Sequence, residues 1–274
     1  MTNLPGEYGP LVRALHQRAA AQRQPLNGTF ELTARCNLAC RMCYINSNAV
    51  GAVATPAREL SAAEWLELAR RAVEHGMMFL LLTGGEVLLR ADFFDIFTPL
   101  TQMGLIITVF SNGTLIDDAI AERLATAPPN RTEISLYGAT AAVYESITGV
   151  PGSYARCCAG IEALVRHRVP LGLKTILTRQ NLHELPALRR MARNWGVPFT
   201  AGWLLTRHRD GAPTPVEQCR LTPENVIELE MQDAAAAATW NADAQRANDG
   251  AAAPAFYCQA GRAAFLISPA GEMN

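Results

Sequence analysis

Short runs of apolar and β-branched residues recur along this chain, and each is followed by a stretch in which apolar residues return at helical spacing. The runs have the length of strands, and the stretches between them have the length of a helix with its loops. The predicted strands lie near residues 29–33, 78–83, 105–110, 132–137, 171–177 and 199–205. Six strand–helix units in succession predict an α/β fold of parallel strands joined by right-handed crossovers.

The predicted helices carry their own start and stop signals. Ser61 and Glu64 form the sequence of a capping box, and Gly76 follows as a stop. Further predicted starts are Asp92, Asp117, Asn181 with Glu184, and Thr222 ahead of Pro223. Before the first strand, residues 11–23 have the apolar spacing of a short amphipathic helix. We expect this helix to cover the bottom of the strand assembly, with a plain surface helix as the alternative.

Composition narrows the class of protein. The chain has 274 residues, 49% of them hydrophobic, so it can bury a large core as one domain plus part of another. Its formal net charge of -1, with no basic run, provides no electrostatic footprint for nucleic acid or an anionic membrane. We find neither a secretory signal nor a stretch of transmembrane length, and therefore expect a cytoplasmic protein.

Three closely spaced cysteines follow the first predicted strand. Cys36, Cys40 and Cys43 have three and then two residues between them, so one loop can turn all three sulfurs toward a common point. Three thiolates suit a soft metal centre with one position left open. Structural zinc normally takes four protein ligands, and no fourth Cys or His lies nearby. A zinc site and three unrelated buried thiols remain as alternatives.

This cysteine spacing resembles the Cys-x3-Cys-x2-Cys signature of the radical S-adenosylmethionine (SAM) enzymes. The resemblance implies a [4Fe-4S] cluster held by Cys36, Cys40 and Cys43, whose fourth iron is free to bind SAM. It also implies a partial, TIM-like (β/α)6 barrel that is open on one side. A doubly wound sheet is the structural alternative. It is disfavoured because unusual residues follow the strand in almost every unit, where a barrel places its reaction chemistry.

The resemblance also assigns SAM contacts to residues that follow the strands. Gly84, Gly85 and Glu86 match the family's Gly-Gly-Glu motif, which holds the amino group of the methionine moiety. The other assigned contacts are Met42 and Tyr44 beside the adenine, Ser111 and Asn112 for ribose or carboxylate, Ser135, and Lys174 or Arg179 for the carboxylate. Each has a plainer alternative. The alternatives are a simple turn for the glycines, an Asn-Gly turn after Ser111, and a position in the barrel wall for Tyr44. For Lys174 and Arg179 the alternative is an ordinary solvated or ion-paired cation.

Several other residues have reactive or charged side chains but match no motif of the family. Cys157 and Cys158 lie beside the apolar face of a predicted helix, so we expect both to be structural. Arg207, His208 and Arg209 follow the sixth strand and are candidates for substrate contact, with a polar loop as the alternative. Trp203, within the sixth predicted strand, is expected to belong to the barrel wall.

The tail carries a second pattern, similar to the SPASM and twitch extensions of radical SAM enzymes. In these extensions a cysteine is followed after roughly a dozen residues by a glycine, and a second cysteine comes five positions after the glycine. Cys258 is separated from Gly271 by twelve residues, which places the expected partner at position 276. We therefore expect an incomplete auxiliary-cluster domain, with Cys258 as its possible ligand in a β-hairpin that includes a strand at 263–268. An orphan Cys258 is the alternative, and nothing in its spacing supports Cys219 as a ligand.

The sequence thus predicts three regions: a helical extension at 1–28, a radical SAM partial barrel at 29–240, and the start of a SPASM or twitch domain at 241–274. The resemblance implies an enzyme that cleaves SAM and abstracts hydrogen, served by a flavodoxin- or ferredoxin-type electron donor. We expect its substrate to be a ribosomally made peptide. Formylglycine formation on a sulfatase-type protein and small-molecule radical chemistry are the alternatives. A metal- or peptide-binding scaffold without turnover is the non-enzymatic alternative.

Overall fold

A curved, fully parallel sheet forms the centre of the protein. The computed structural model describes residues 8–45, 58–208, 216–232 and 260–273, with single positions between 234 and 241. Seven strands follow the order β6-β5-β4-β3-β2-β1-β7. They are β1 (Asn27–Glu31), β2 (Phe79–Thr83), β3 (Ile106–Ser111), β4 (Arg131–Ser135), β5 (Leu171–Ile176), β6 (Phe199–Gly202) and β7 (Ala264–Ile267). The two edge strands do not pair with each other, so the barrel stays open, as the sequence predicts.

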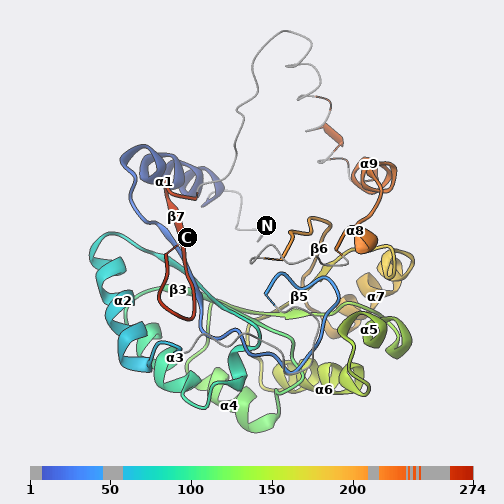
Figure 1. The fold of residues 1–274 in the computed structure, drawn as a ribbon, viewed down its shortest axis with the longest axis horizontal. Coiled ribbons are helices and arrows are strands. Elements are labelled where there is room, and N and C mark those ends of the chain that lie inside the picture. The colour runs from blue at the N-terminus through green and yellow to red at the C-terminus, as the bar shows by residue number, and fades with distance from the viewer. Residues whose placement is uncertain are drawn as a thin grey trace.

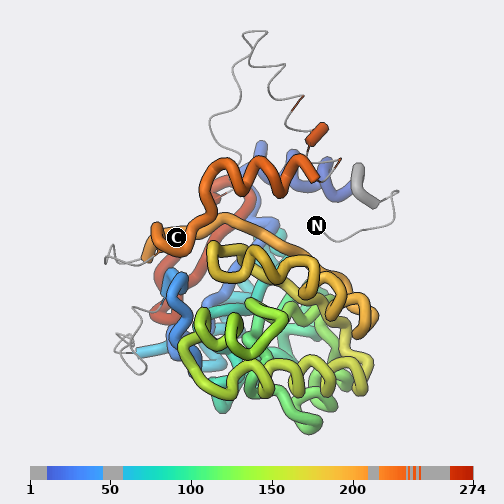
Figure 2. Tube along the Cα trace, turned by 90° about the vertical axis from the view of Figure 1, so that its right-hand side faces the viewer, coloured from blue at the N-terminus to red at the C-terminus, as the bar shows by residue number. Residues whose placement is uncertain are grey.

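Six helices cover the outside of this sheet in the order of the chain. They are α2 (Ala62–Glu74), α3 (Phe93–Thr101), α4 (Asp118–Thr126), α5 (Ala141–Thr148), α6 (Ser153–Arg166) and α7 (Leu185–Trp195). Figure 1 shows them as an arc around the strands. Two short 3-10 turns, η1 (Val87–Leu89) and η2 (Leu182–Glu184), precede α3 and α7. Two further helices, α8 (Val216–Cys219) and α9 (Pro223–Met231), follow β6 in the chain. Figure 2 shows α9, in orange, outside the helices that cover the sheet.

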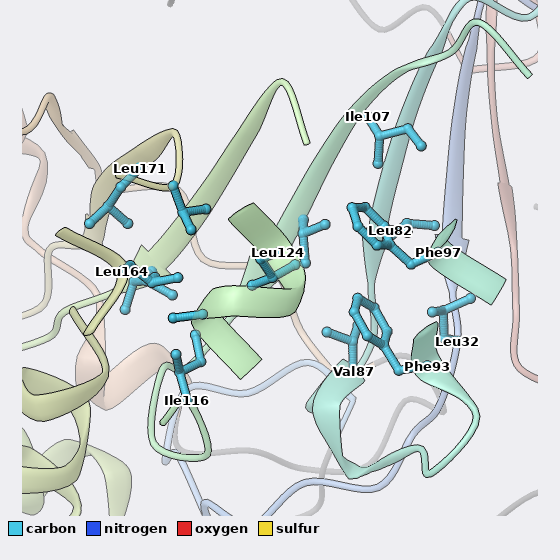
Figure 3. Close-up of a cluster of buried hydrophobic side chains, with 14 of the residues drawn as sticks. Leu32, Leu82, Val87, Phe93, Phe97, Ile107, Ile116, Leu124, Leu164 and Leu171 are labelled. Carbon is cyan, nitrogen blue, oxygen red and sulfur yellow. The ribbon is translucent and has the colours of Figure 1, made fainter. Parts of the chain in front are cut away.

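The main core lies between the outer face of the sheet and these helices. Leu82 and Ile107, from neighbouring strands, lie close to Phe97 of α3 (Figure 3), and all three are almost fully buried. Phe30 of β1 meets Trp65 of α2 with ring centroids 4.9 Å apart. Because strand side chains alternate between faces, the polar residues of the same strands point to the inside of the barrel. The apolar face is therefore used for stability and the polar face is left for a site.

The predicted helix starts are confirmed, but two of them lack a side-chain capping bond. Ser61 and Glu64 form both bonds of the capping box, and Asp117 and Thr222 cap α4 and α9 through their side chains. Asp92 makes no capping bond, because its carboxylate pairs with Arg90 at 2.7 Å. Asn181 and Glu184 form no capping box, because their side chains bond to neighbouring loops instead.

The N-terminal helix covers the lower end of the sheet. Helix α1 (Tyr8–Gln22) packs Ala19 against Ala263, and the ring of His16 lies 5.8 Å from that of Phe79. Phe79 is the first residue of β2, so this contact is at the amino end of the strands. Helix α1 therefore lies opposite the end where a barrel carries its chemistry. Within the described residues, no helix is both long and apolar enough to cross a bilayer.

The strand expected at 263–268 is present, but its pairing was not foreseen. Strand β7 pairs in parallel with β1, with Ala264 opposite Asn27 and Ile267 opposite Phe30, and so extends the main sheet. The chain then turns at Gly271, and an antiparallel bridge joins Ile267 to Met273. Cys258 and Arg209 lie outside the described residues, so their predicted roles stay predictions.

Candidate active site

A cavity of about 570 Å³ opens inside the barrel at the carboxyl ends of the strands. All three cysteines of the triplet line it, and so do most of the residues assigned to SAM from the sequence. These are Cys36, Cys40, Cys43, Met42, Tyr44, Gly84, Gly85, Ser111, Asn112, Ser135 and Lys174. Two other residues assigned to SAM, Glu86 and Arg179, are not among the residues that line the cavity. A second cavity of about 420 Å³, between α2 and β7, contains none of these groups.

The two glycines of the Gly-Gly-Glu motif make room for the cysteine loop. The amide of Gly85 donates to the carbonyl oxygen of Thr33 at 2.7 Å, and that of Glu86 donates to Arg35 at 2.8 Å. A Cβ on Gly84 would lie 2.3 Å from the Thr33 oxygen, and one on Gly85 would lie 2.2 Å from the Arg35 oxygen. Any side chain at either position would therefore displace the backbone that leads to Cys36.

The carboxylate of Glu86 connects two strand ends. It accepts hydrogen bonds from the Ser111 hydroxyl at 2.8 Å, the Asn112 amide at 2.7 Å and the Leu88 amide at 3.2 Å. The side chain is 1% exposed. Burial raises the pKa of Glu86, and the hydrogen bonds from Asn112, Ser111 and Leu88 oppose that rise. The carboxylate therefore orders the loops after β2 and β3, and its predicted contact with SAM stays a prediction.

Replacing Glu86 with glutamine is expected to lower the free energy of unfolding by about 1–3 kcal/mol. Glutamine retains the size of the side chain, but its amide nitrogen would face donors that need an acceptor. Urea denaturation of Glu86→Gln against the wild type measures the loss. The matched control is Glu122→Gln on the exposed face of α4, which is expected to change stability by less than about 0.5 kcal/mol. Equal stabilities of wild type and Glu86→Gln would contradict this role.

A side-chain network joins the turn after β3 to the cysteine loop. Asn112 donates to the Asn37 side-chain oxygen at 2.8 Å, and Asn37 donates to the Thr114 hydroxyl at 2.8 Å. The oxygen of Asn112 accepts from the backbone amide of Thr114. The Asn112 nitrogen also lies 3.9 Å from the sulfur of Cys36. Asn37 and Thr114 were not singled out from the sequence, because their partners lie more than 70 positions away in the chain.

The three cysteines are free thiols, partly buried at the cavity wall. A turn between Cys40 and Cys43 is closed by a hydrogen bond of 3.0 Å from the amide of Cys43 to the carbonyl of Cys40. Burial raises the pKa of Cys36 to about 11, and the charges of Glu86 and Cys43 add to the rise. Burial also raises the pKa of Cys40, as do the charges of Cys43 and Cys36. The loop thus gathers three soft donors that influence one another electrostatically.

This donor set fits an iron–sulfur cluster better than a single ion. Among the described residues, no three Cys, His, Asp or Glu side chains converge closely enough to hold one metal ion. Zinc would need such convergence, because all its ligands bind one atom. In a four-iron cluster each cysteine binds a different iron, so the thiolates stand further apart. The three-thiolate donor set suits a cluster with one open position, and the zinc site remains the alternative.

Met42 and Tyr44 occupy different parts of the wall. Met42 is 6% exposed and packs with Ile147 and Leu205, so it contributes an apolar surface. The hydroxyl of Tyr44 donates to the carboxylate of Glu31, at the end of β1, at 2.9 Å. Tyr44 thereby fixes the far end of the cysteine loop to the first strand, which is the wall role that the sequence left open.

The inner wall contains one charged and one aromatic residue that the sequence analysis did not single out. Glu133 lines the cavity two positions before Ser135, on the same face of β4. Phe110 of β3 also lines it, and the ammonium of Lys174 lies 2.7 Å from the centre of the Phe110 ring. The alternation of side chains along a strand could have identified Glu133 once Ser135 was assigned to the inner face.

Asn181 and Glu184 hold together the loops after β4 and β5. The side chain of Asn181 accepts from the Thr178 amide at 2.7 Å and donates to the Tyr137 carbonyl at 2.9 Å. Glu184 accepts from the amide of Ala139 at 2.6 Å. These bonds fix the rim of the cavity beside Tyr137, because buried backbone groups there depend on the two side chains.

The remaining candidates lie away from the cavity. The guanidinium of Arg179 donates to the Arg220 carbonyl at 2.7 Å, and Arg207 forms an ion pair with Glu217. His208 is buried just beyond the cavity lining. Trp203 follows β6 with 37% of its surface exposed and bonds to Glu230 of α9, so the wall interpretation is wrong for it.

The three other cysteines in the described part of the chain are buried or partly buried outside the cavity lining. Cys157 is fully buried in the main core, as expected for a structural residue, and Cys158 beside it is partly buried. Cys219 is 3% exposed and packs in the apolar cluster of Met42.

Comparison with known proteins agrees with this geometry. The family model described as "Radical SAM superfamily" matches residues 30–192. An "AdoMet-dependent heme synthase" of Methanosarcina barkeri is 34% identical over 168 residues, which cover 61% of this chain and 47% of that protein. A "PqqA peptide cyclase" of Gluconobacter oxydans is 28% identical over 173 residues, covering 63% and 47%. The chain therefore spans about half the length of these curated relatives.

Among solved structures, Streptococcus suis SuiB bound to the precursor peptide SuiA has the same fold. The TM-score is 0.67 at 15% identity, and the match covers 100% of this chain and 65% of that one. The family model covers more than half of the present sequence, and it includes the cysteine loop and all but the last two strands. Enzymes of this superfamily use a [4Fe-4S] cluster and SAM. The chain belongs to the radical SAM superfamily.

Proposed function

We propose that this protein is an enzyme that reductively cleaves SAM and uses the resulting radical to modify a peptide. The observation that carries the proposal is the convergence in one cavity of the cysteine triplet, the Gly84–Gly85 backbone and the Ser111–Asn112 turn. These groups come from three successive strand ends, and the chain around them is fixed by the bonds of Glu86. A binding module would not need this combination of soft metal donors and polar groups.

Cys36, Cys40 and Cys43 are the residues that would hold the cluster. When bound, the cluster supplies the electron that splits SAM into methionine and a 5'-deoxyadenosyl radical, which takes a hydrogen atom from the substrate. The thiols must lose their protons for metal binding, and burial alone disfavours that loss at Cys36 and Cys40. Cluster assembly is therefore coupled to release of protons from this loop.

The other residues of the cavity bind, orient and shield. Because the carboxylate of Glu86 is engaged with Ser111 and Asn112, we assign the ammonium group of SAM to the backbone carbonyl oxygens of Gly84 and Gly85. We assign Ser135, which lines the same cavity on β4, to a further contact with SAM. Met42 and Leu205 provide an apolar side that keeps water from the reacting carbon.

A peptide substrate is supported by two likenesses. One curated relative is named a peptide cyclase, and a structural neighbour was solved with its precursor peptide. In the described sheet β6 and β7 are the two edge strands, and we propose that an extended peptide reaches the cavity between them. By analogy with the superfamily, we also propose a flavodoxin- or ferredoxin-type protein as the electron donor. A tetrapyrrole substrate is the second candidate, because the 34% identical relative is named a heme synthase.

The test uses anaerobically reconstituted protein with SAM, dithionite and peptides encoded beside its gene. We expect a peptide product that has lost the mass of two hydrogen atoms in a crosslink, or that carries another mapped change, together with 5'-deoxyadenosine. Liquid chromatography with tandem mass spectrometry detects both. A parallel reaction contains an iron porphyrin that carries propionate groups. Modification of the porphyrin and of none of the peptides would replace the peptide proposal with the tetrapyrrole candidate.

A further inference from the structure

Lys174 is the single lysine in a sequence with 24 basic residues. Every other basic position is an arginine, so the chain places its one ammonium group inside the barrel. Lysine differs from arginine in being a compact charge that can release its proton when it is buried. An arginine at this position would retain its charge and present a wide, planar group. The location of Lys174 therefore indicates a requirement that arginine does not meet.

Lys174 lies on the inner face of β5. Its Cα partners are Ser135 on β4 and Thr200 on β6, and both of these residues also line the cavity. The ammonium group rests on the ring of Phe110, 2.7 Å from its centre. Among the described residues that line the cavity, Lys174 is the only cation and Glu133 the only carboxylate.

No described carboxylate lies within ion-pair distance of Lys174. Glu133 influences it electrostatically, but the near partner of Glu133 is Arg131 at 3.5 Å. Burial lowers the pKa of Lys174 to about 7, and Glu133 only partly opposes the fall. A cation with an aromatic face on one side and open cavity on the other is stabilised by an anion that enters the cavity.

The carboxylate of SAM is a poor match for that anion. In this superfamily SAM is bound to the cluster, which places its carboxylate beside the cysteine loop. Burial raises the pKa of Tyr137, which lies just beyond β4, and the charges of the three cysteines add to the rise. The pKa of Lys174 responds instead to its burial and to Glu133. The strand register places Lys174 opposite Ser135, the last residue of β4 and two positions before Tyr137, so Lys174 lies deeper in the barrel than Tyr137. We therefore replace its expected contact with SAM by a contact with the substrate.

We propose that Lys174 binds a carboxylate of the peptide substrate and so determines which residue is presented to the radical. This inference rests on the proposed function, and it narrows the substrate to a peptide with an acidic side chain or a C-terminal carboxylate at the reacting position. The ammonium group, Phe110 and Ser135 form the subsite. A carboxylate that binds there forms a charge-assisted hydrogen bond and raises the fraction of Lys174 that is protonated.

Because the lysine is unique, isotope labelling reports on it alone. Protein that contains ¹³C-lysine, reconstituted and saturated with SAM, is titrated with three peptides: acetyl-Ala-Glu-Ala-amide, acetyl-Ala-Gln-Ala-amide and acetyl-Ala-Ala-Ala with a free carboxylate. We expect a carboxylate peptide to shift the lysine Cε signal toward its protonated position and to bind at least about tenfold more tightly than the glutamine peptide, as one charge-assisted bond predicts. The two carboxylate peptides distinguish a side chain from a C-terminus.

The variant Lys174→Gln is expected to bind the glutamate and glutamine peptides equally, and Lys174→Arg to recover part of the preference. Equal binding of the three peptides to the wild type, or a preference that survives in Lys174→Gln, would overturn the inference. Deoxyadenosine formed by the same wild-type sample keeps the two claims separate. Deoxyadenosine without carboxylate preference removes only this inference, whereas preference without deoxyadenosine contradicts the proposed function and leaves the subsite in place.

Discussion

A single methyl group on Gly85 is expected to abolish cluster binding. The added Cβ would lie 2.2 Å from the carbonyl oxygen of Arg35 and 2.7 Å from that of Ala34, closer than van der Waals contact permits. These oxygens belong to backbone, which cannot rotate away as a flexible side chain can, so the loop that leads to Cys36 must move. We expect Gly85→Ala to reduce iron content to background and deoxyadenosine formation by at least about 100-fold, since displacements of 1 Å have effects of this size.

The matched control for this experiment is Gly104→Ala. Gly104 has a positive φ, at +74°, which Gly85 does not have, and a Cβ there meets nothing within 4 Å. Its cost is therefore confined to backbone strain of about 1–3 kcal/mol. Iron content is measured by mass spectrometry of the metal and folding by circular dichroism. A folded Gly85→Ala protein that retains its iron would contradict the view that these glycines exist to seat the cysteine loop.

Replacing any one of Cys36, Cys40 or Cys43 with alanine is expected to remove the cluster. All three line the same cavity, and two thiolates do not hold a four-iron cluster stably. Reconstituted wild type is expected to contain about 4 iron atoms per chain, and each variant close to none. Cys158→Ala is the control, because that thiol lies on α6 and is expected to leave the iron content unchanged.

The metal that is bound also tests the alternatives. One zinc ion and no iron in reconstituted wild type would revive the structural zinc site. Absence of any metal would favour three unrelated thiols or a scaffold without turnover. The electronic absorption of the reconstituted protein distinguishes an iron–sulfur cluster from adventitious iron.

The strands and the cysteine loop were predictable because their signals are local. Phe30, Leu82 and Ile107 belong to short apolar runs, and burial against helices is what such runs require. The cysteine triplet is contained in eight residues, from Cys36 to Cys43. Strand β7 was recognised as a strand, but its partner was not, because pairing with β1 joins residues more than 200 positions apart.

The contacts that organise the site were not predictable in the same way. Glu86 was assigned to a ligand because of its motif, whereas its actual partners, Ser111 and Asn112, lie 25 and 26 residues further along the chain. Asn181 matched a helix start signal, but the chain brings the carbonyl of Tyr137 within 2.9 Å and the side chain turns to it. Local propensity was overridden by tertiary hydrogen bonds that satisfy buried backbone groups.

Lys174 was predictable as a candidate site residue, but its surroundings were not. The sequence identifies it as a candidate contact for SAM within the fifth predicted strand, and it is the only lysine in the sequence. Its neighbours Phe110 and Glu133 come from two other strands, and only the fold shows the ring beneath the ammonium group. We therefore propose that Lys174 contacts the substrate and not SAM.

The most direct test of the central claim is cleavage of SAM by the full-length, anaerobically reconstituted protein in the presence of dithionite. The comparison protein carries Cys36→Ala, Cys40→Ala and Cys43→Ala together, and 5'-deoxyadenosine and methionine are quantified by mass spectrometry. We predict equimolar formation of both products by the wild type and none by the variant. Wild-type protein that binds iron but forms no deoxyadenosine would contradict the assignment of this cavity to radical chemistry.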